Sequence, residues 1–248
     1  MALILATDHG TGRFVARSAG VLAGTAAATE VYGQLDPEVR VTWRLAVGDE
    51  VEAGQEFGWV DGPLRSVLTG ERCALNFLGH LSGVATLTRA YVAAAGPGTR
   101  IRDTRKTLPG LRALEKAAVR AGGGVNHRGG LSDGILIKDN HLRLSSIGEA
   151  VRRARSRWPG VLVEVECDTL AQVGEAKTAG ADLVLLDNMS PEEVAEAAGI
   201  LGGAIPIEVS GGVALDSVAA YAAAGADLIS VGALTHSAPV LDVALDLE

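Results

Sequence analysis

Short apolar runs alternate with longer amphipathic segments from about residue 99 onward. Runs of this kind, bounded by polar and glycine residues, are typical of strands buried on both faces of a parallel sheet. The segments between them have helical spacing, as in the one that carries Leu215, Val218, Ala219 and Ala222. We therefore expect tandem strand–helix units, with strands at 134–137, 161–165, 183–186, 205–209 and 228–231.

The spacing of these units predicts a barrel. The residues that end four successive strands, Glu166, Asp187, Ser210 and Gly232, lie 21, 23 and 22 residues apart, which suits tandem units better than a sheet with long crossovers. After one strand, Ser190-Pro-Glu-Glu193 combines a helix N-cap, a proline at the first helical position and a capping-box glutamate. The region holds six strands in this interpretation. Because a closed barrel of this type has eight, we expect an incomplete one.

The first part of the chain has a different pattern. Short strand-like runs at 14–16, 39–45 and 57–60 surround a possible helix at 24–35, which predicts a small α/β layer. A helical region follows from Pro63 to about Ala95, and Ser82 is placed to cap a second helix within it. Glu71-Arg72 interrupts the apolar spacing. Such a pair is most often a solvated turn or a structural ion pair, but Arg72 stays a candidate for a shared site.

Composition bounds the class of protein. The chain has 248 residues, 48% of them hydrophobic, which suffices for a substantial core. Its net charge of −8 argues against nucleic acid as a partner. The two cysteines, Cys73 and Cys167, fit neither a disulfide framework nor a metal motif, and no signal segment is evident, so we expect a cytoplasmic protein. No apolar run approaches the length that crosses a bilayer, and no membrane partner is expected.

A basic cluster stands out against this acidic background. It comprises Asp103-Thr-Arg-Lys-Thr107, Asn126-His-Arg128 and Ile137-Lys-Asp-Asn-His141. Arginine forks, lysine point charges and histidine donors are the groups that bind carboxylates and phosphates. The simpler interpretation is a set of solvated surface charges. We favour an anion site because the cluster follows apolar runs and lies beside glycines, where α/β folds place their sites.

The predicted strand ends divide into three chemical types. Cations come first, at Thr104-Arg-Lys106 and Lys138; carboxylates come next, at Glu164-Val-Glu166 and Asp187; and glycine turns come last, at Ser210-Gly-Gly212 and Gly232. Glu166 and Asp187 on adjacent strands predict a Mg²⁺ site, since this ion prefers oxygen ligands. The glycine turns offer backbone N–H groups to a phosphate, and His236 adds a nearby donor, although a single Ser-Gly-Gly turn is more often only a turn.

With these motifs the chain resembles the quinolinate phosphoribosyltransferase family. The resemblance covers nearly the whole chain in order, and its most specific blocks are Thr-Arg-Lys-Thr, Asn-His-Arg and Ile-Lys-Asp-Asn-His. It implies an α/β protein with an N-terminal α/β sandwich domain and an incomplete α/β barrel domain that carries the active site. The boundaries implied are 1–98 for the sandwich, joined by the C-terminal tail 238–248, and 99–237 for the barrel.

The resemblance also implies a reaction. Quinolinate and phosphoribosyl pyrophosphate would give nicotinate mononucleotide, pyrophosphate and CO₂ in NAD biosynthesis, with Mg²⁺ as cofactor. Arg105, His127, Arg128 and Lys138 would hold the quinolinate carboxylates, and Lys106 would bridge toward the other substrate. Glu166 and Asp187 would face the ribose and the metal, and the 5-phosphate would be bound by Ser210, Gly211, Gly232 and His236.

The same resemblance implies a homodimer in which Arg72 reaches the neighbouring subunit's site. Members of the family usually carry a further N-terminal segment, so we expect that this chain starts late or lacks that segment, which would affect dimer packing and closure of the site. Leu108 replaces a common second threonine.

Three alternatives remain at this point. One is a related transferase that acts on another aromatic acid or beside a molybdenum transport system, which a comparison of quinolinate with nicotinate would separate. Another is a barrel aldolase that forms a Schiff base at Lys138, which borohydride would trap. The last is a non-catalytic anion-binding barrel.

Overall fold

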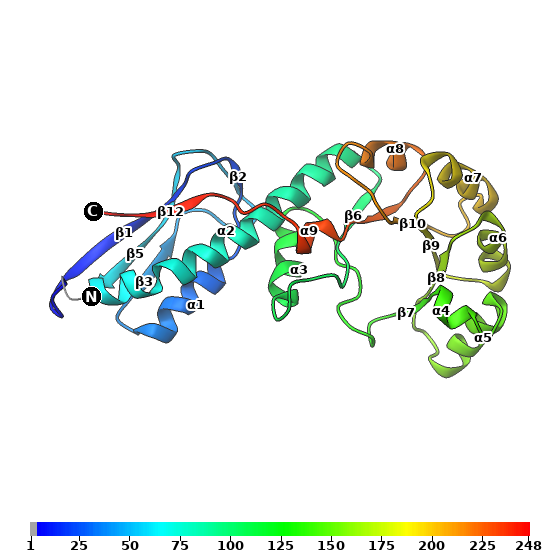
Figure 1. The fold of residues 1–248 in the computed structure, drawn as a ribbon, viewed down its shortest axis with the longest axis horizontal. Helices are drawn as coiled ribbons and strands as arrows, with labels where there is room; N and C mark the ends of the chain where they lie inside the picture. Colours follow the sequence, from blue (N-terminus) through cyan, green and yellow to red (C-terminus); the bar gives the residue numbers. More distant parts are fainter. Residues whose placement is uncertain (1–3) are drawn as a thin grey trace. The chain divides into compact units, whose positions relative to one another are not determined.

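The computed structural model describes residues 4–248, and the chain divides into two compact units (Figure 1). The first unit, here called the sheet unit, comprises the chain up to Arg89, Leu108–Gly123 and Ala233–Glu248. The second, the barrel unit, comprises Ala90–Thr107 and Gly124–Gly232. No helix in residues 4–248 has the length and apolarity needed to span a bilayer.

The sheet unit contains an antiparallel sheet in the order β12-β1-β5-β3. Its strands are β1 (His9–Ala16), β3 (Arg40–Trp43), β5 (Glu56–Pro63) and β12 (Val243–Leu247). The last strand pairs with β1, so the end of the chain completes the sheet built by its beginning. A small ribbon pairs β2 (Gly20–Val21) with β4 (Glu50–Val51). The helices are α1 (Thr25–Leu35), α3 (Arg112–Ala121), α9 (Ala233–His236) and most of α2 (Leu64–Ala95).

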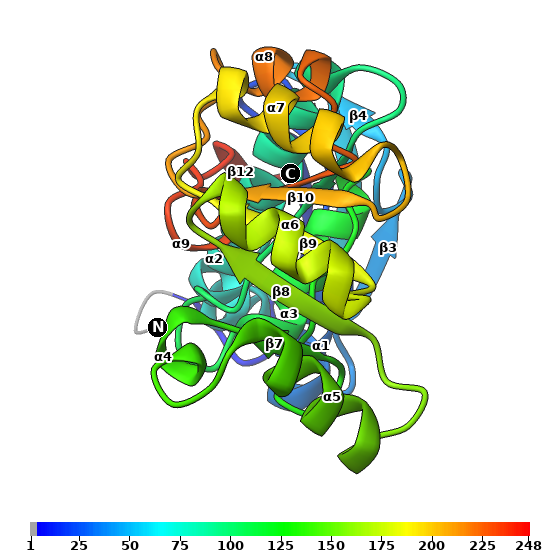
Figure 2. The same cartoon turned by 90° about the vertical axis from the view of Figure 1, so that its right-hand side faces the viewer.

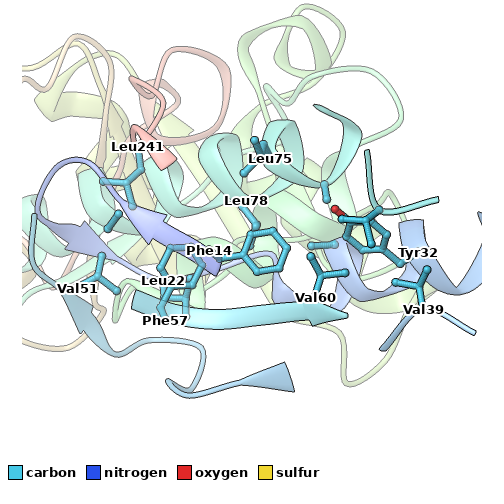
Figure 3. Packing of buried hydrophobic residues seen from close by; sticks show 14 residues of the cluster. Phe14, Leu22, Tyr32, Val39, Val51, Phe57, Val60, Leu75, Leu78 and Leu241 are labelled. Carbon is cyan, nitrogen blue, oxygen red and sulfur yellow. The ribbon is translucent and has the colours of Figure 1, made fainter. Parts of the chain in front are cut away.

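Aromatic side chains form the centre of this unit's core (Figure 3). Phe14 and Phe57 are fully buried, and the Phe14 ring stacks on Trp43 at a centroid distance of 4.9 Å. Gly58 leaves space for that indole ring, because a Cβ at this position would lie 2.5 Å from it. Leu75 and Leu78 of α2 pack into the same cluster, which explains the apolar spacing of that helix.

Two features of this unit differ from the sequence-based prediction. The strands β1 and β5 are longer than the apolar runs from which they were predicted, because their polar ends also pair with each other in the sheet. The expectation that Ser82 caps a second helix is wrong, since α2 runs through it without interruption. The buried Ser82 hydroxyl instead accepts a hydrogen bond from Ala23 N at 2.9 Å and donates to Ala23 O. The predicted helix at 24–35 is confirmed as α1.

The barrel unit has six parallel strands in the order β6-β11-β10-β9-β8-β7. They are β6 (Arg100–Arg102), β7 (Ile135–Ile137), β8 (Val163–Cys167), β9 (Leu183–Asp187), β10 (Ile207–Ser210) and β11 (Leu228–Ser230). Between the edge strands β6 and β7, the described residues form no ladder, and only an isolated bridge joins Arg102 to Val125. The predicted incomplete α/β barrel is therefore confirmed.

Helices cover one face of these strands, as Figure 2 shows for α5, α6 and α7. The helices are α4 (Asp139–Leu142), α5 (Ile147–Arg157), α6 (Leu170–Ala179), α7 (Pro191–Leu201) and α8 (Val218–Ala223). The capping box predicted at Ser190 is present, with Glu193 N donating to Ser190 Oγ and Ser190 N donating to the Glu193 carboxylate. The helix expected to include Leu215 begins only at Val218, because the Ser217 hydroxyl bonds to the backbone of Ala214 and closes a turn there.

Candidate active site

The carboxyl ends of the parallel strands surround a pocket of about 270 Å³. Because these ends meet at one side of the sheet, residues far apart in sequence become neighbours. The lining includes most of the residues singled out from the sequence, namely Arg105, Lys106, His127, Arg128, Lys138, Glu166, Asp187 and Ser210. It also includes Thr104, Leu136, Leu185, Glu208 and Ser230, to which the sequence interpretation gave no role.

Four other predicted residues lie outside this lining. Gly211 follows Ser210 directly, and Gly232 follows β11. Arg72 lies on α2 and His236 at the end of α9, both in the sheet unit. The Arg72 side chain is 76% exposed and lies 3.7 Å from Glu71, and His236 Nδ1 lies 2.6 Å from the Ser237 hydroxyl.

The cationic side of the pocket has two arginines near each other. The Thr104 hydroxyl accepts a hydrogen bond from Lys106 N at 3.0 Å and so shapes the loop that carries Arg105. Arg128 NH1 donates to Gly134 O at 3.3 Å. Burial lowers the pKa of Arg128, and the positive charge of Arg105 lowers it further. An anion bound between the two guanidinium groups would relieve this repulsion, so the arrangement favours an acidic ligand.

The acidic side of the pocket is formed by β8 and β9. Glu166 at the end of β8 forms an ion pair with Lys138 Nζ, which follows β7. Asp187 at the end of β9 accepts a hydrogen bond from Asn188 Nδ2 at 2.7 Å. Both carboxylates line the pocket, and carboxylate oxygens are the ligands that Mg²⁺ prefers. The donor set therefore fits this ion.

A tight turn holds Asp187 beside the first glycine turn. Asn188 has a φ of 57°, the one positive value for a non-glycine residue in the described chain, and its N–H donates to Ser210 O at 2.9 Å. Gly211 has a φ of 96°, and a Cβ there would lie 2.3 Å from Asn188 Oδ1. Glycine is thus required at 211 both by the backbone conformation and by the close approach of Asn188.

A largely buried polar layer borders the pocket, and three of its residues also line the pocket, namely His127, Glu208 and Ser230. Its centre is His127, whose backbone N–H donates to Asp103 Oδ1 at 2.9 Å. The Nδ1 atom of His127 accepts a hydrogen bond from Arg128 N at 2.7 Å. Its Nε2 atom lies 3.4 Å from a carboxylate oxygen of Glu164 and 3.4 Å from one of Glu208. Both ring nitrogens are therefore directed at groups of the protein itself.

Arg102 and Ser230 complete this layer on the neighbouring strands. Arg102 NH1 forms an ion pair with Glu208 Oε2, and the Ser230 hydroxyl lies 2.5 Å from Glu208 Oε1. Burial raises the pKa of Glu164, and burial followed by the charge of Glu164 raises that of Glu208. Sequence reasoning missed these roles. The signal that could have revealed them is the presence of acidic residues inside apolar strands, since residues at alternate positions of a strand point to the same buried face.

The chain matches the sequence models of two protein domains that belong to one family. Residues 1–82 match the model of the quinolinate phosphoribosyl transferase N-terminal domain, and residues 84–246 match that of the C-terminal domain. The chain belongs to the quinolinate phosphoribosyl transferase family, and the resemblance inferred from its motifs is confirmed.

Individual proteins of known name are similar to the chain over most of its length. The chain is 44% identical over 246 residues to the carboxylating nicotinate-nucleotide pyrophosphorylase of Mycobacterium leprae, covering 96% of this chain and 86% of the relative. It is 44% identical over 236 residues to a probable enzyme of the same name in Bacillus subtilis, covering 94% and 82%. The structure of the nicotinate-nucleotide pyrophosphorylase from Francisella tularensis matches with a TM-score of 0.95 at 40% identity, covering 100% of this chain and 88% of that one.

Proposed function

We propose that the protein transfers the phosphoribosyl group of phosphoribosyl pyrophosphate to quinolinate. Pyrophosphate and CO₂ are released, and nicotinate mononucleotide is formed, which is a step of NAD biosynthesis. The observation that carries this function is the gathering of cations from β6, β7 and their loops opposite the carboxylates of β8 and β9 in a single pocket. A carboxylating pyrophosphorylase needs both halves, because one substrate is a dicarboxylate and the other carries a ribose and phosphates.

The reaction requires no nucleophilic side chain. The pyridine nitrogen of quinolinate attacks the anomeric carbon, the bond to pyrophosphate breaks, and positive charge develops on the ribose during the transfer. The site therefore acts by holding two polyanions together and by neutralising the departing one. Loss of the 2-carboxylate as CO₂ then leaves an electron pair on the ring carbon, which the pyridinium nitrogen stabilises. A proton must be added there, and Lys138 is our candidate donor.

The roles of the cations follow from the two kinds of substrate. The groups that would bind the quinolinate carboxylates are Arg105, His127, Arg128 and Lys138, all of which line the pocket. The two arginines can each form paired hydrogen bonds to a carboxylate, which a lysine cannot. Lys106 would extend toward the phosphoribosyl substrate. Binding of quinolinate would also compete for Lys138, which is paired with Glu166 in this structure.

The remaining residues would bind the phosphoribosyl pyrophosphate. Glu166 and Asp187 would hold the ribose hydroxyls and Mg²⁺, and the ion would supply charge neutralisation for the pyrophosphate. The turns at Ser210-Gly211 and Gly232 would offer backbone N–H groups to the 5-phosphate, with His236 as a further donor. The support for the first of these turns is the positive φ of Gly211 and its close approach to Asn188, which follows Asp187.

We further propose a homodimer with shared sites, to which Arg72 contributes from the partner. Its support within this chain is the exposure of the Arg72 side chain, which lies 3.7 Å from the adjacent Glu71. An exposed arginine next to an apolar helix face is available to a second subunit.

The decisive experiment is a coupled measurement of pyrophosphate and CO₂ release. Quinolinate with phosphoribosyl pyrophosphate and Mg²⁺ should release both in equal amounts, and EDTA should abolish the turnover. Nicotinate is the matched control, because it lacks the 2-carboxylate and would leave part of the cationic surface unpaired. Turnover of nicotinate at an equal rate would contradict the proposal.

A further inference from the structure

Asp103 is a fully buried acid that directly follows β6. A carboxylate in such a position is strongly destabilising unless it is hydrogen-bonded. Its Oδ1 atom accepts from His127 N at 2.9 Å, and its Oδ2 atom accepts from Asn126 Nδ2. The two donors are neighbours in sequence, 23 and 24 residues beyond Asp103. One buried carboxyl group therefore joins the end of β6 to a distant loop.

The two chain segments joined in this way both carry cations of the pocket. The first cationic segment, Thr104–Lys106, follows Asp103 directly, and the second, His127–Arg128, follows Asn126. Every residue of both segments lines the pocket. The backbone adds an isolated bridge between the residues that precede Asp103 and Asn126. Beyond this bridge, the side chain of Asp103 continues the connection toward the pocket.

The two cationic segments need a fixed spacing to recognise a dicarboxylate. The charges of Arg105 and Arg128 repel each other, so the attraction that holds the segments together must come from other groups. Segments without a firm link would have to be ordered when the ligand binds, which lowers the affinity. The hydrogen bonds of Asp103 supply such a link before any ligand arrives.

We propose that Asp103, with Asn126 as its paired donor, is a positioning residue that fixes the spacing between the two cationic segments. That spacing is what the two carboxylates of quinolinate require. Asp103 acts through the segments and does not touch the substrate. The identity of the ligand in this inference rests on the proposed function, whereas the link between Asp103 and the loop rests on the contacts alone.

The direction of the side-chain hydrogen bond makes the pair testable. A carboxylate can only accept, so the Asn126 amide donates through Nδ2. Asn126→Asp would place two carboxylates against each other without a donor in the pair. Combining it with Asp103→Asn restores one amide and one carboxylate in exchanged places, at the net charge of the wild-type pair. Asp103→Asn should therefore be harmful in the wild type and beneficial in the Asn126→Asp background.

Calorimetric titration with quinolinate, without phosphoribosyl pyrophosphate, measures the effect on binding. We expect Kd to rise by about thirtyfold in Asp103→Ala and in Asn126→Asp. In Asp103→Asn, which keeps an acceptor for the His127 N–H, it should rise by about fivefold. The exchanged double variant should bind within about threefold of wild type. Charge alone predicts the opposite sign for Asp103→Ala, because the loss of an acid near cations would tighten the binding of a dicarboxylate.

Asp182→Ala is the matched control within the barrel unit. Asp182 precedes β9 and accepts a hydrogen bond from Val163 N at 2.9 Å, which is the same kind of bond at the amino end of the strands. Its loss should lower the free energy of unfolding, while Kd for quinolinate stays within about twofold of wild type. Denaturant titration of all variants supplies the comparison of stability.

Hydrogen exchange of the His127 amide tests the link without any ligand. We expect slow exchange in the wild type and in the exchanged double variant. In Asp103→Ala the amide loses its acceptor, and exchange should be at least about tenfold faster. Unchanged protection in Asp103→Ala would show that Asp103 does not hold the loop, and the proposal would fail.

The outcomes separate this inference from the proposed function. If wild type neither binds nor turns over quinolinate, the proposed function fails, and hydrogen exchange still decides the link. If Asp103→Ala binds quinolinate as tightly as wild type, the positioning role is wrong. If Asp103→Ala does not fold, the double variant decides, and binding no better than that of Asn126→Asp overturns the proposal. A loss of stability with unchanged Kd would make Asp103 a purely structural residue and overturn it as well.

Discussion

The two sheets of this protein bury different kinds of side chain. The antiparallel sheet of the sheet unit packs apolar rings, with Phe14 and Phe57 fully buried. The parallel sheet of the barrel unit buries Glu164, Glu166 and Glu208 within or at the end of its strands. Apolar burial stabilises a fold without regard to partners, whereas a buried acid needs specific ones. The first sheet therefore stabilises the fold through apolar packing. The second sheet is less favourable to stability, because it buries carboxylates, but those carboxylates are held in fixed positions at the pocket.

The largest expected effect is on stability, from Phe57→Ala in the sheet unit. The substitution leaves a cavity among stacked rings, at centroid distances of 6.0 Å to Phe14 and 6.1 Å to Trp43. The free energy of unfolding should fall by about 3–5 kcal/mol. Denaturant titration measures it, and the exposed Val240→Ala is the control, with an expected change below about 0.5 kcal/mol. Equal stability of the two variants would show that this cluster is not the source of stability.

Arg105→Ala and Arg128→Ala should have the opposite profile, a large loss of activity with little loss of stability. In the proposed complex with quinolinate, each variant would remove a paired hydrogen-bond donor from a desolvated carboxylate. We expect kcat/KM for quinolinate to fall about a hundredfold or more, or roughly 3 kcal/mol. Arg153→Ala on the exposed face of α5 is the control and should be near wild type, since its ion pair with Glu149 is exposed. Activity close to wild type in either pocket variant would mean that quinolinate binds elsewhere.

The sequence predicted much of the fold because local rules governed it. The regular spacing of strand ends foretold the parallel strands, and the cap at Ser190 formed as expected because it needs only residues three positions apart. The charged strand ends also gathered in one pocket, since parallel strands place these ends together. These features depend on residues close together in sequence and on the parallel arrangement of the strands, and not on particular contacts between distant residues.

The features that the sequence did not predict depend on partners far apart in the chain. Ser82 has the composition of a helix cap, but its hydroxyl is used by Ala23, 59 residues away. The role of Glu208 depends on Arg102, 106 residues away. The turn at Asn188 could not be predicted, because Asn188 contacts Ser210 and Gly211, which lie at the end of the next strand. Side-chain chemistry alone does not specify which of several possible partners is near in space.

Asn188 allows the stabilising and the positioning roles of one residue to be separated. Its left-handed backbone conformation is tolerated by asparagine, costs alanine about 1–2 kcal/mol and suits glycine. Asn188→Ala should therefore lower the free energy of unfolding by about 1–2 kcal/mol, and Asn188→Gly by less. Both variants lose the amide that donates to Asp187. Both should thus raise KM for phosphoribosyl pyrophosphate to a similar extent, by about fivefold.

Stability and KM are measured on the same preparations by denaturant titration and by initial rates. If alanine and glycine reduce stability equally, the backbone conformation at 188 is not under strain. If KM follows stability and differs between the two, the amide has no separate role at Asp187. Asn188→Asp provides a third comparison, because it keeps the shape and the left-handed preference and replaces the amide donor by a carboxylate that repels Asp187.

The last prediction addresses whether the sheet unit contributes to chemistry as well as stability. Arg72 lies in the sheet unit and Lys138 in the barrel unit, and in the proposed dimer one site combines Arg72 of one subunit with Lys138 of the other. Arg72→Ala and Lys138→Ala chains, each inactive alone, are mixed under conditions that exchange subunits. A heterodimer with two-fold related interfaces then has one site with both residues intact and one with neither. Activity should return to at most about half of wild type in proportion to the heterodimer measured by native mass spectrometry. Arg153→Ala mixed with Lys138→Ala is the control for the mixing procedure: Arg153→Ala is active alone, so this mixture should show no gain of activity when subunits exchange. If the Arg72 mixture stays inactive while heterodimers are present, Arg72 acts within its own chain or has no role, and the shared-site model fails.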